Sequence, residues 1–285
     1  MPLQLITDQN NELGENPLWH PAEKKLYWED ILTGRLFRYD PATDQTETIY
    51  TGDLVGGFTF QAGGGLLLFM ARGRIALWKD GQLTTLIDEI PAERESRFND
   101  VIADPLGRVF CGTMPTAEHG GRLYRLERDL SLTPLVENVA ISNGMGFTRD
   151  RKTFYYTESD ARKIHIFDYD ETTGALTNQR LWRDFSAGPG VPDGMTVDSE
   201  GCVWSARWDG NAIFRYAPDG TELQKVEFPA KKVTSLCFGG DDLRDLYITT
   251  ALHGGTKAEE GEGAGALFRL RVDVPGLPEF YSRIG

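Results

Sequence analysis

The sequence is short of cysteine and histidine, and this scarcity excludes several kinds of metal site. Its 285 residues include three cysteines and four histidines. The histidines have no H-E-x-x-H or other paired spacing and the cysteines form no C-x-x-C pair, so a zinc site built from these residues is not expected. Cys111, Cys202 and Cys237 are odd in number and lie in or beside apolar runs. We therefore expect buried free thiols in a reducing compartment such as the cytoplasm.

Long apolar runs and positive charge are also scarce. No run of 18 apolar residues occurs, so no transmembrane helix is expected, and the first residues resemble no signal peptide. The net charge of −13 would repel nucleic acid and anionic membrane surfaces and would attract cations. Neither a G-x-S-x-G motif nor a P-loop is present. We expect a cytoplasmic protein, a monomer or weak homo-oligomer, that binds neither nucleic acid nor a membrane.

What the sequence does contain is an internal repeat. Each copy has an apolar strand, a tight turn and a second apolar strand, and a third strand of alternating polarity follows. Less regular fourth strands are expected at 45–52, 83–90, 132–139 and 223–229. The copies, of which the second is decayed, cover residues 14–30, 56–73, 98–114, 142–159, 192–208 and 233–251.

The spacing of the copies predicts the fold. Four-stranded units that recur every 40–50 residues or so are typical of β-propellers, and six copies indicate six blades. We expect an all-β, six-bladed propeller with little helix and a central metal site, formed by residues 1–285 as a single domain. Residues 3–8 are expected to supply the outer strand of the last blade and so close the ring. The acidic segment 254–265 is expected to be a mobile connection.

One aligned position in the repeat is rich in oxygen-bearing side chains. This position begins the innermost strand of each blade, near the mouth of the central channel. Two carboxylates and two amides there suit a hard divalent cation. Alternatively, Asn143-Gly144 and Asp193-Gly194 are ordinary turn dipeptides, but turns would not require the shared register. The six residues, in order, are Glu15, Gly56, Asn99, Asn143, Asp193 and Thr234.

Several motifs resemble those of the SMP-30/gluconolactonase/regucalcin-like family and occur in family order along nearly the whole chain. They are GENPLWH, RFND with DPLGR, GTM, ISNGMGF, VPDGM with DSEG, and VTSLCFGG. The resemblance implies a six-bladed propeller that hydrolyses sugar-acid lactones with one central divalent metal ion. Ca²⁺, Zn²⁺, Mn²⁺, Mg²⁺ and Fe²⁺ all accept oxygen ligands, so the metal stays open.

The resemblance also implies roles for individual residues. Glu15, Asn143 and Asp193 match the family's metal ligands, and Asp193 also matches its general base. Arg97 and Asn99 match the substrate-contacting pair, and Asn99 could in addition reach the metal directly or through water. The other interpretation of Arg97 is a surface ion pair with Glu93 or Glu95.

Three further residues have weaker assignments. Glu118, in the short loop after GTM, is a weak match to a substrate contact. Met114 and Phe58 are expected either to wall the pocket or to belong to the core.

The aligned residues and the family resemblance together predict metal-dependent hydrolysis of a small-molecule sugar lactone to its aldonic acid. One rival is a phosphotriesterase, organophosphate hydrolase or other esterase that uses the same metal. A second rival is a non-enzymatic calcium-binding or scaffolding propeller. The sequence leaves open which lactone is preferred.

Overall fold

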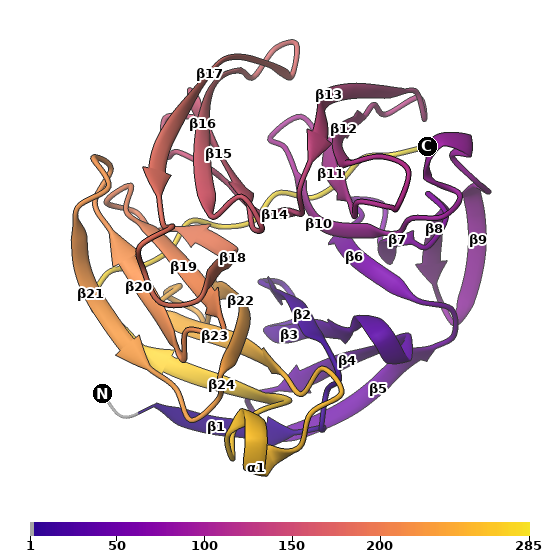
Figure 1. Ribbon diagram of the computed structural model, residues 1–285. Coiled ribbons are helices and arrows are strands. Elements are labelled where there is room, and N and C mark those ends of the chain that lie inside the picture. The colour runs from indigo at the N-terminus through magenta and orange to yellow at the C-terminus, as the bar shows by residue number, and fades with distance from the viewer. Residues whose placement is uncertain (1–2) are drawn as a thin grey trace.

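The computed structural model describes residues 3–285, which form a ring of six four-stranded antiparallel sheets (Figure 1). The helical segments of this part of the chain are η1 (Ile31–Thr33), η2 (Pro91–Glu93) and α1 (Lys257–Glu260). None of its helices has the length and apolar character that crossing a membrane requires. The all-β propeller expected from the repeat is therefore confirmed.

The first three blades follow one another in sequence, each beginning at the centre of the ring (Figure 1). The strands are β2 (Gly14–His20), β3 (Lys25–Asp30), β4 (Arg35–Asp40) and β5 (Gln45–Thr51); β6 (Val55–Phe60), β7 (Leu66–Met70), β8 (Ile75–Lys79) and β9 (Gln82–Ile87); and β10 (Phe98–Ala103), β11 (Val109–Thr113), β12 (Gly121–Leu126) and β13 (Leu132–Val139).

The last three blades repeat the pattern, and the N-terminal strand completes the sixth. β1 (Gln4–Asp8) pairs antiparallel with β24 and is the outer strand of the last blade. The N-terminal strand therefore closes the ring, as expected. The strands are β14 (Ser142–Phe147), β15 (Thr153–Glu158), β16 (Lys163–Asp170) and β17 (Ala175–Asp184); β18 (Val191–Val197), β19 (Val203–Trp208), β20 (Ala212–Tyr216) and β21 (Glu222–Glu227); and β22 (Lys232–Gly239), β23 (Asp245–Ala251), β24 (Ala266–Arg271) and β1.

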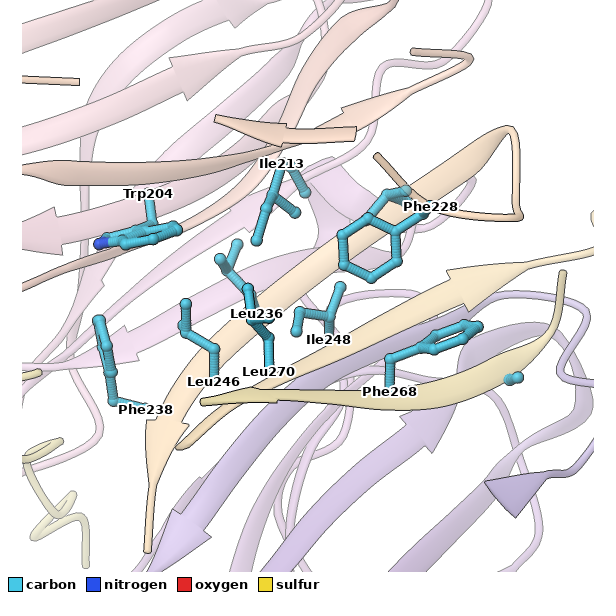
Figure 2. Close-up of a cluster of buried hydrophobic side chains, with 12 residues drawn as sticks. Trp204, Ile213, Phe228, Leu236, Phe238, Leu246, Ile248, Phe268 and Leu270 are labelled. Carbon is cyan, nitrogen blue, oxygen red and sulfur yellow. The ribbon is translucent and has the colours of Figure 1, made fainter. Parts of the chain in front are cut away.

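The core consists of apolar layers between adjacent blades. Figure 2 shows the layer between the fifth and sixth blades, where Trp204 meets the edge of Phe238 with ring centroids 6.3 Å apart. Phe228 and Phe268 pack in the same way, 5.5 Å apart. Burying one large apolar side chain contributes about 1.5–3 kcal/mol, so these layers hold the six inner strands in place around the channel.

The segment after β24 crosses the end of the ring away from the starts of the inner strands. Leu277 and Phe280 line a cavity with residues at the far ends of β14 and β18. The segment then reaches the second and third blades, where the Ser282 N–H donates to Phe60 O at 2.8 Å and the Arg283 N–H to Gly107 O at 2.8 Å. The C-terminal segment thus joins the last blade to the early ones.

Two smaller expectations also have outcomes here. Cys111, Cys202 and Cys237 are all buried free thiols, as expected. The segment 254–265, for which mobility stays a prediction, contains α1, whose N-terminus is closed by a capping box between Thr256 and Glu259.

Candidate active site

A cavity of about 250 Å³ opens at the end of the ring where the inner strands begin. Four of the aligned polar residues, Glu15, Asn99, Asn143 and Asp193, line it together with Arg97. These side chains come from the first, third, fourth and fifth blades. The structure therefore brings together the five central residues that the sequence identified.

Each inner strand changes register next to its aligned residue. In β2 the irregularity lies between Glu15 and Leu18, and in β14 it lies between Asn143 and Met145. A β-bulge bends the strand and redirects a side chain. The remaining four inner strands have equivalent irregularities between Val55 and Gly57, Phe98 and Val101, Pro192 and Met195, and Val233 and Leu236.

The aligned glycine of the second blade is explained by close packing. A Cβ on Gly56 would stand 2.0 Å from the backbone oxygen of Phe98 in the third blade. No side chain fits there, so this blade supplies no ligand. Thr234 of the sixth blade donates its hydroxyl to Gly14 O at 2.6 Å, which fixes the join between the sixth and first blades.

Hydrogen bonds hold the polar side chains in place. The Asn143 Nδ2 group donates to Asp193 Oδ1, and Arg97 Nη1 donates to Asn99 Oδ1 at 2.7 Å. Asn99 Nδ2 in turn donates to Ser142 O at 2.8 Å. Arg97 carries five N–H donors in a fixed fork, so most of its donors are left for a bound molecule.

The carboxylates of the site are buried close to one another. Burial raises the pKa of Glu15 well above its usual value, and the charges of Asp193 and Asp100 raise it further. Burial and the charge of Asp100 likewise raise the pKa of Asp193. Burial raises the pKa of Asp100 to about 7, although Arg97 opposes this shift. Acids crowded in this way favour either protons or a cation.

The donor set fits a hard divalent cation. Within residues 3–285, no three His, Cys, Asp or Glu side chains form a metal cluster, so a metal here depends on amide oxygens besides Glu15 and Asp193. The amide of Asn143 turns its nitrogen toward Asp193, and a half-turn of that amide would present its oxygen instead. Oxygen ligands without histidine or thiolate suit Ca²⁺, Mg²⁺ or Mn²⁺ in particular.

Of the other residues expected at the site, some line the cavity and others do not. Met114 lines the cavity, whereas Phe58 is fully buried in the core. Arg97 does not pair with Glu93, whose carboxylate is bound instead by Arg122 at 2.6 Å. Glu118 is exposed after β11 and is not among the lining residues, so its contact with substrate stays a prediction.

Seven lining residues were missed by the sequence reasoning, and three of them carry titratable or aromatic side chains. Asp160 follows β15, Trp208 ends β19 and His253 follows β23. The aligned repeat gave a partial signal, because all three lie at the end of the second strand of their copies or within two residues of it. Trp208 and His253 contact each other edge to face, with ring centroids 4.9 Å apart.

Comparison with known proteins gives relatives that span the whole chain. It is 48% identical to pentonolactonase XacC of Haloferax volcanii, covering 100% of this chain and 99% of the relative. It is 36% identical to 6-deoxy-6-sulfogluconolactonase of Pseudomonas putida, covering 97% of each. Among solved structures, a calcium-binding protein, regucalcin, from Agrobacterium tumefaciens superposes with a TM-score of 0.92 at 24% identity, covering 99% of this chain and 98% of that one.

The last of these similarities supports the six-bladed fold, and the first two extend through every strand that lines the cavity. The family profile described as the SMP-30/Gluconolactonase/LRE-like region matches residues 13–252, which begin just before β2 and end just after β23. The chain belongs to the SMP-30/gluconolactonase/LRE-like family.

Proposed function

We propose that this protein hydrolyses the carboxylic ester bond of a sugar-acid lactone and releases the aldonic acid. The observation that carries this function is the convergence of Glu15, Asn143 and Asp193 with Arg97 and Asn99 on one cavity of about 250 Å³. Two relatives at 48% and 36% identity are named as lactonases. Since the pockets that bind drug-sized ligands measure about 300–1,000 Å³, this smaller cavity suits a single sugar ring.

Glu15, Asn143 and Asp193 would hold one divalent metal ion, and Asn99 has an amide oxygen within the same cavity. When bound, such an ion supplies Lewis acidity, which stabilises negative charge on the carbonyl oxygen of the lactone. The relatives include a protein described as calcium-binding, which supports a divalent cation without deciding its identity.

Asp193 is the general base of this proposal. Its carboxylate takes a proton from the water that attacks the lactone carbonyl and returns a proton to the ring oxygen as the ring opens. A well-placed acid–base group accelerates a reaction by a factor of about 10²–10⁴. The Asn143 amide donates to Asp193 Oδ1, so the proposed base lies in direct contact with a second proposed metal ligand.

Arg97 and Asn99 orient the substrate. Their mutual hydrogen bond of 2.7 Å and the bond from Asn99 to Ser142 O hold both side chains at the cavity wall. The free donors of Arg97 then bind sugar hydroxyls and keep the carbonyl beside Asp193.

A substrate panel tests this function against its rivals. Aldonolactones and a paraoxon-like phosphotriester are assayed side by side by acid release at fixed pH, with and without added divalent metal. Metal-dependent turnover of the lactones is expected. Faster turnover of the phosphotriester would favour the organophosphate hydrolase, and no turnover of any ester would favour a non-enzymatic calcium-binding propeller.

The remaining proposals concern the whole molecule. Residues 1–285 act as one domain, because the N-terminal strand completes the last blade. The three buried free thiols fit a reducing compartment such as the cytoplasm. The net charge of −13 disfavours nucleic acid and anionic membrane as partners, and we propose a monomer or weak homo-oligomer.

A further inference from the structure

One of the residues that line the cavity beside its polar side chains is an aromatic side chain held in place by its neighbours. Trp208 is half-buried and packs against the apolar cluster of Leu13, Ile31 and Ala251. The ring of His253 meets it at 83°. Because Trp208 lines the cavity and is supported by its neighbours, it presents a flat apolar surface whose position is fixed.

A buried lysine supports the same tryptophan. Lys232 Nζ lies 5.5 Å from the centroid of the Trp208 ring, and a cation over an aromatic face is attracted to it. The same ammonium is paired with Glu260 and lies 3.4 Å from Asp209. Its charge is therefore already neutralised and is not offered to a ligand in the cavity.

The charges that line the cavity are mainly negative. Asp160 is exposed at the cavity wall, beside Ser159, whose hydroxyl donates to Pro192 O at 2.7 Å. In the described chain, residues 3–285, no ion pair joins Asp160 to a basic side chain. The guanidinium of Arg97, which also lines the cavity, faces the carboxylates of Glu15 and Asp193, so its charge is already offset.

We infer that the cavity selects uncharged single-ring aldonolactones, with Trp208 stacking on the sugar face and Asp160 disfavouring an anionic tail. One face of a sugar ring exposes C–H groups. Moving these apolar groups from water onto an aromatic surface is favourable. An anionic group far from the carbonyl would meet Asp160 with no free cation to offset the repulsion. This inference rests on the proposed lactonase function and deepens it.

The test compares one hexonolactone with the same lactone that bears a sulfonate at carbon 6. We expect the wild-type protein to have at least about tenfold higher kcat/KM for the uncharged lactone, which corresponds to the repulsion of one unpaired charge. Asp160→Lys should reduce this preference at least about fivefold through the KM of the anionic lactone. The relative named 6-deoxy-6-sulfogluconolactonase serves as the reference enzyme for the sulfonated substrate.

Two controls separate a local effect from a general one. Asp88→Lys changes the net charge equally at an exposed position beyond the outer strand β9 and should leave the preference unchanged. Trp208→Leu should raise KM for the uncharged lactone about tenfold with little change in kcat, whereas Trp208→Phe, which keeps a flat ring, should recover most of the loss. Thermal unfolding of each variant verifies that it folds.

The outcomes distinguish this inference from the function on which it rests. Equal kcat/KM for both lactones, or an equal response to Asp160→Lys and Asp88→Lys, would overturn the selectivity while leaving the lactonase intact. Hydrolysis of neither lactone, with metal saturating, would overturn the proposed function and the inference together.

Discussion

Gly144 lies so close to the neighbouring blade that a Cβ on it would stand 2.5 Å from the backbone oxygen of Asp193. The same Cβ would lie 2.8 Å from the Met195 nitrogen. Both contacts are with backbone atoms of β18, which cannot move without shifting the whole strand. The glycine after Asn143 therefore allows the fourth and fifth blades to bring their polar residues together.

Gly144→Ala is expected to separate β14 from β18 and to disturb the site. Overpacking of this kind costs about 1–3 kcal/mol, and a misplacement of about 1 Å can reduce activity about 10²-fold. The free energy of unfolding and kcat/KM on a lactone are measured. Gly63→Ala is the control, because nothing lies within 4 Å of its Cβ position. Activity within twofold of wild type would show that this close approach is not needed.

Asp193→Asn is expected to affect activity and stability in opposite directions. Loss of the proposed general base should reduce kcat by a factor of about 10²–10⁴. In metal-free protein at neutral pH the same change should raise the unfolding temperature, because a neutral amide replaces a buried acid whose ionisation is disfavoured by burial and by the charge of Asp100. Near-normal turnover with metal saturating would remove Asp193 from the mechanism.

The ring and the polar residues of its cavity could be predicted because the same sequence pattern recurs at the same position in each copy of the repeat. Glu15, Asn99, Asn143 and Asp193 occupy one aligned position in separate copies, and all four lie near the starts of inner strands. Once the repeat is recognised, the closed ring alone brings such positions together.

The other lining residues could not be predicted in the same way, because whether they reach the cavity depends on how the blades are oriented relative to one another. Asp160, Trp208 and His253 reach the cavity from three different blades. The pattern also left open whether Asn143-Gly144 is a turn. The structure places this dipeptide inside β14. Its glycine is required because the backbone of the neighbouring blade leaves no room for a Cβ.

Removal and return of divalent metal should change both stability and activity. A cation that binds only the native state stabilises it by about 2.7 kcal/mol at 100 times its dissociation constant. We expect EDTA to abolish lactone hydrolysis and to lower the unfolding temperature, and we expect Ca²⁺, Mn²⁺, Zn²⁺ or Mg²⁺ to restore both to different extents. Full activity of metal-free protein would contradict the Lewis-acid role.

Glu15→Gln should weaken metal binding at least about tenfold, because it removes one of the two ligand carboxylates. Isothermal titration with Ca²⁺ or Mn²⁺ measures the affinity directly. Glu118→Gln is the matched control, since Glu118 is exposed outside the cavity and should leave the affinity unchanged. A change in KM for lactone in this control would support the substrate contact proposed for Glu118. Unaltered metal affinity of Glu15→Gln would exclude Glu15 as a ligand.

Glu279 lies in the C-terminal segment that crosses the far end of the channel. We expect its carboxyl group to make the free energy of unfolding depend on pH. Burial raises its pKa from 4.5 to about 7, so between these values the folded protein holds a proton that the unfolded chain has lost. The stabilisation linked to this proton is complete below the unfolded pKa and is lost as the pH rises through the folded pKa. The charged Glu279 carboxylate therefore destabilises the protein above about pH 7.

Glu279→Gln should consequently raise the free energy of unfolding at about pH 8 and leave it nearly unchanged at about pH 4.5, where the native carboxyl is already neutral. Urea unfolding at both pH values measures the difference. Glu222→Gln, at an exposed position in the outer strand β21, should have the same small effect at both. A Glu279→Gln variant whose gain did not grow with pH would mean that water reaches this carboxylate in the folded protein and that the C-terminal segment leaves this end of the channel open.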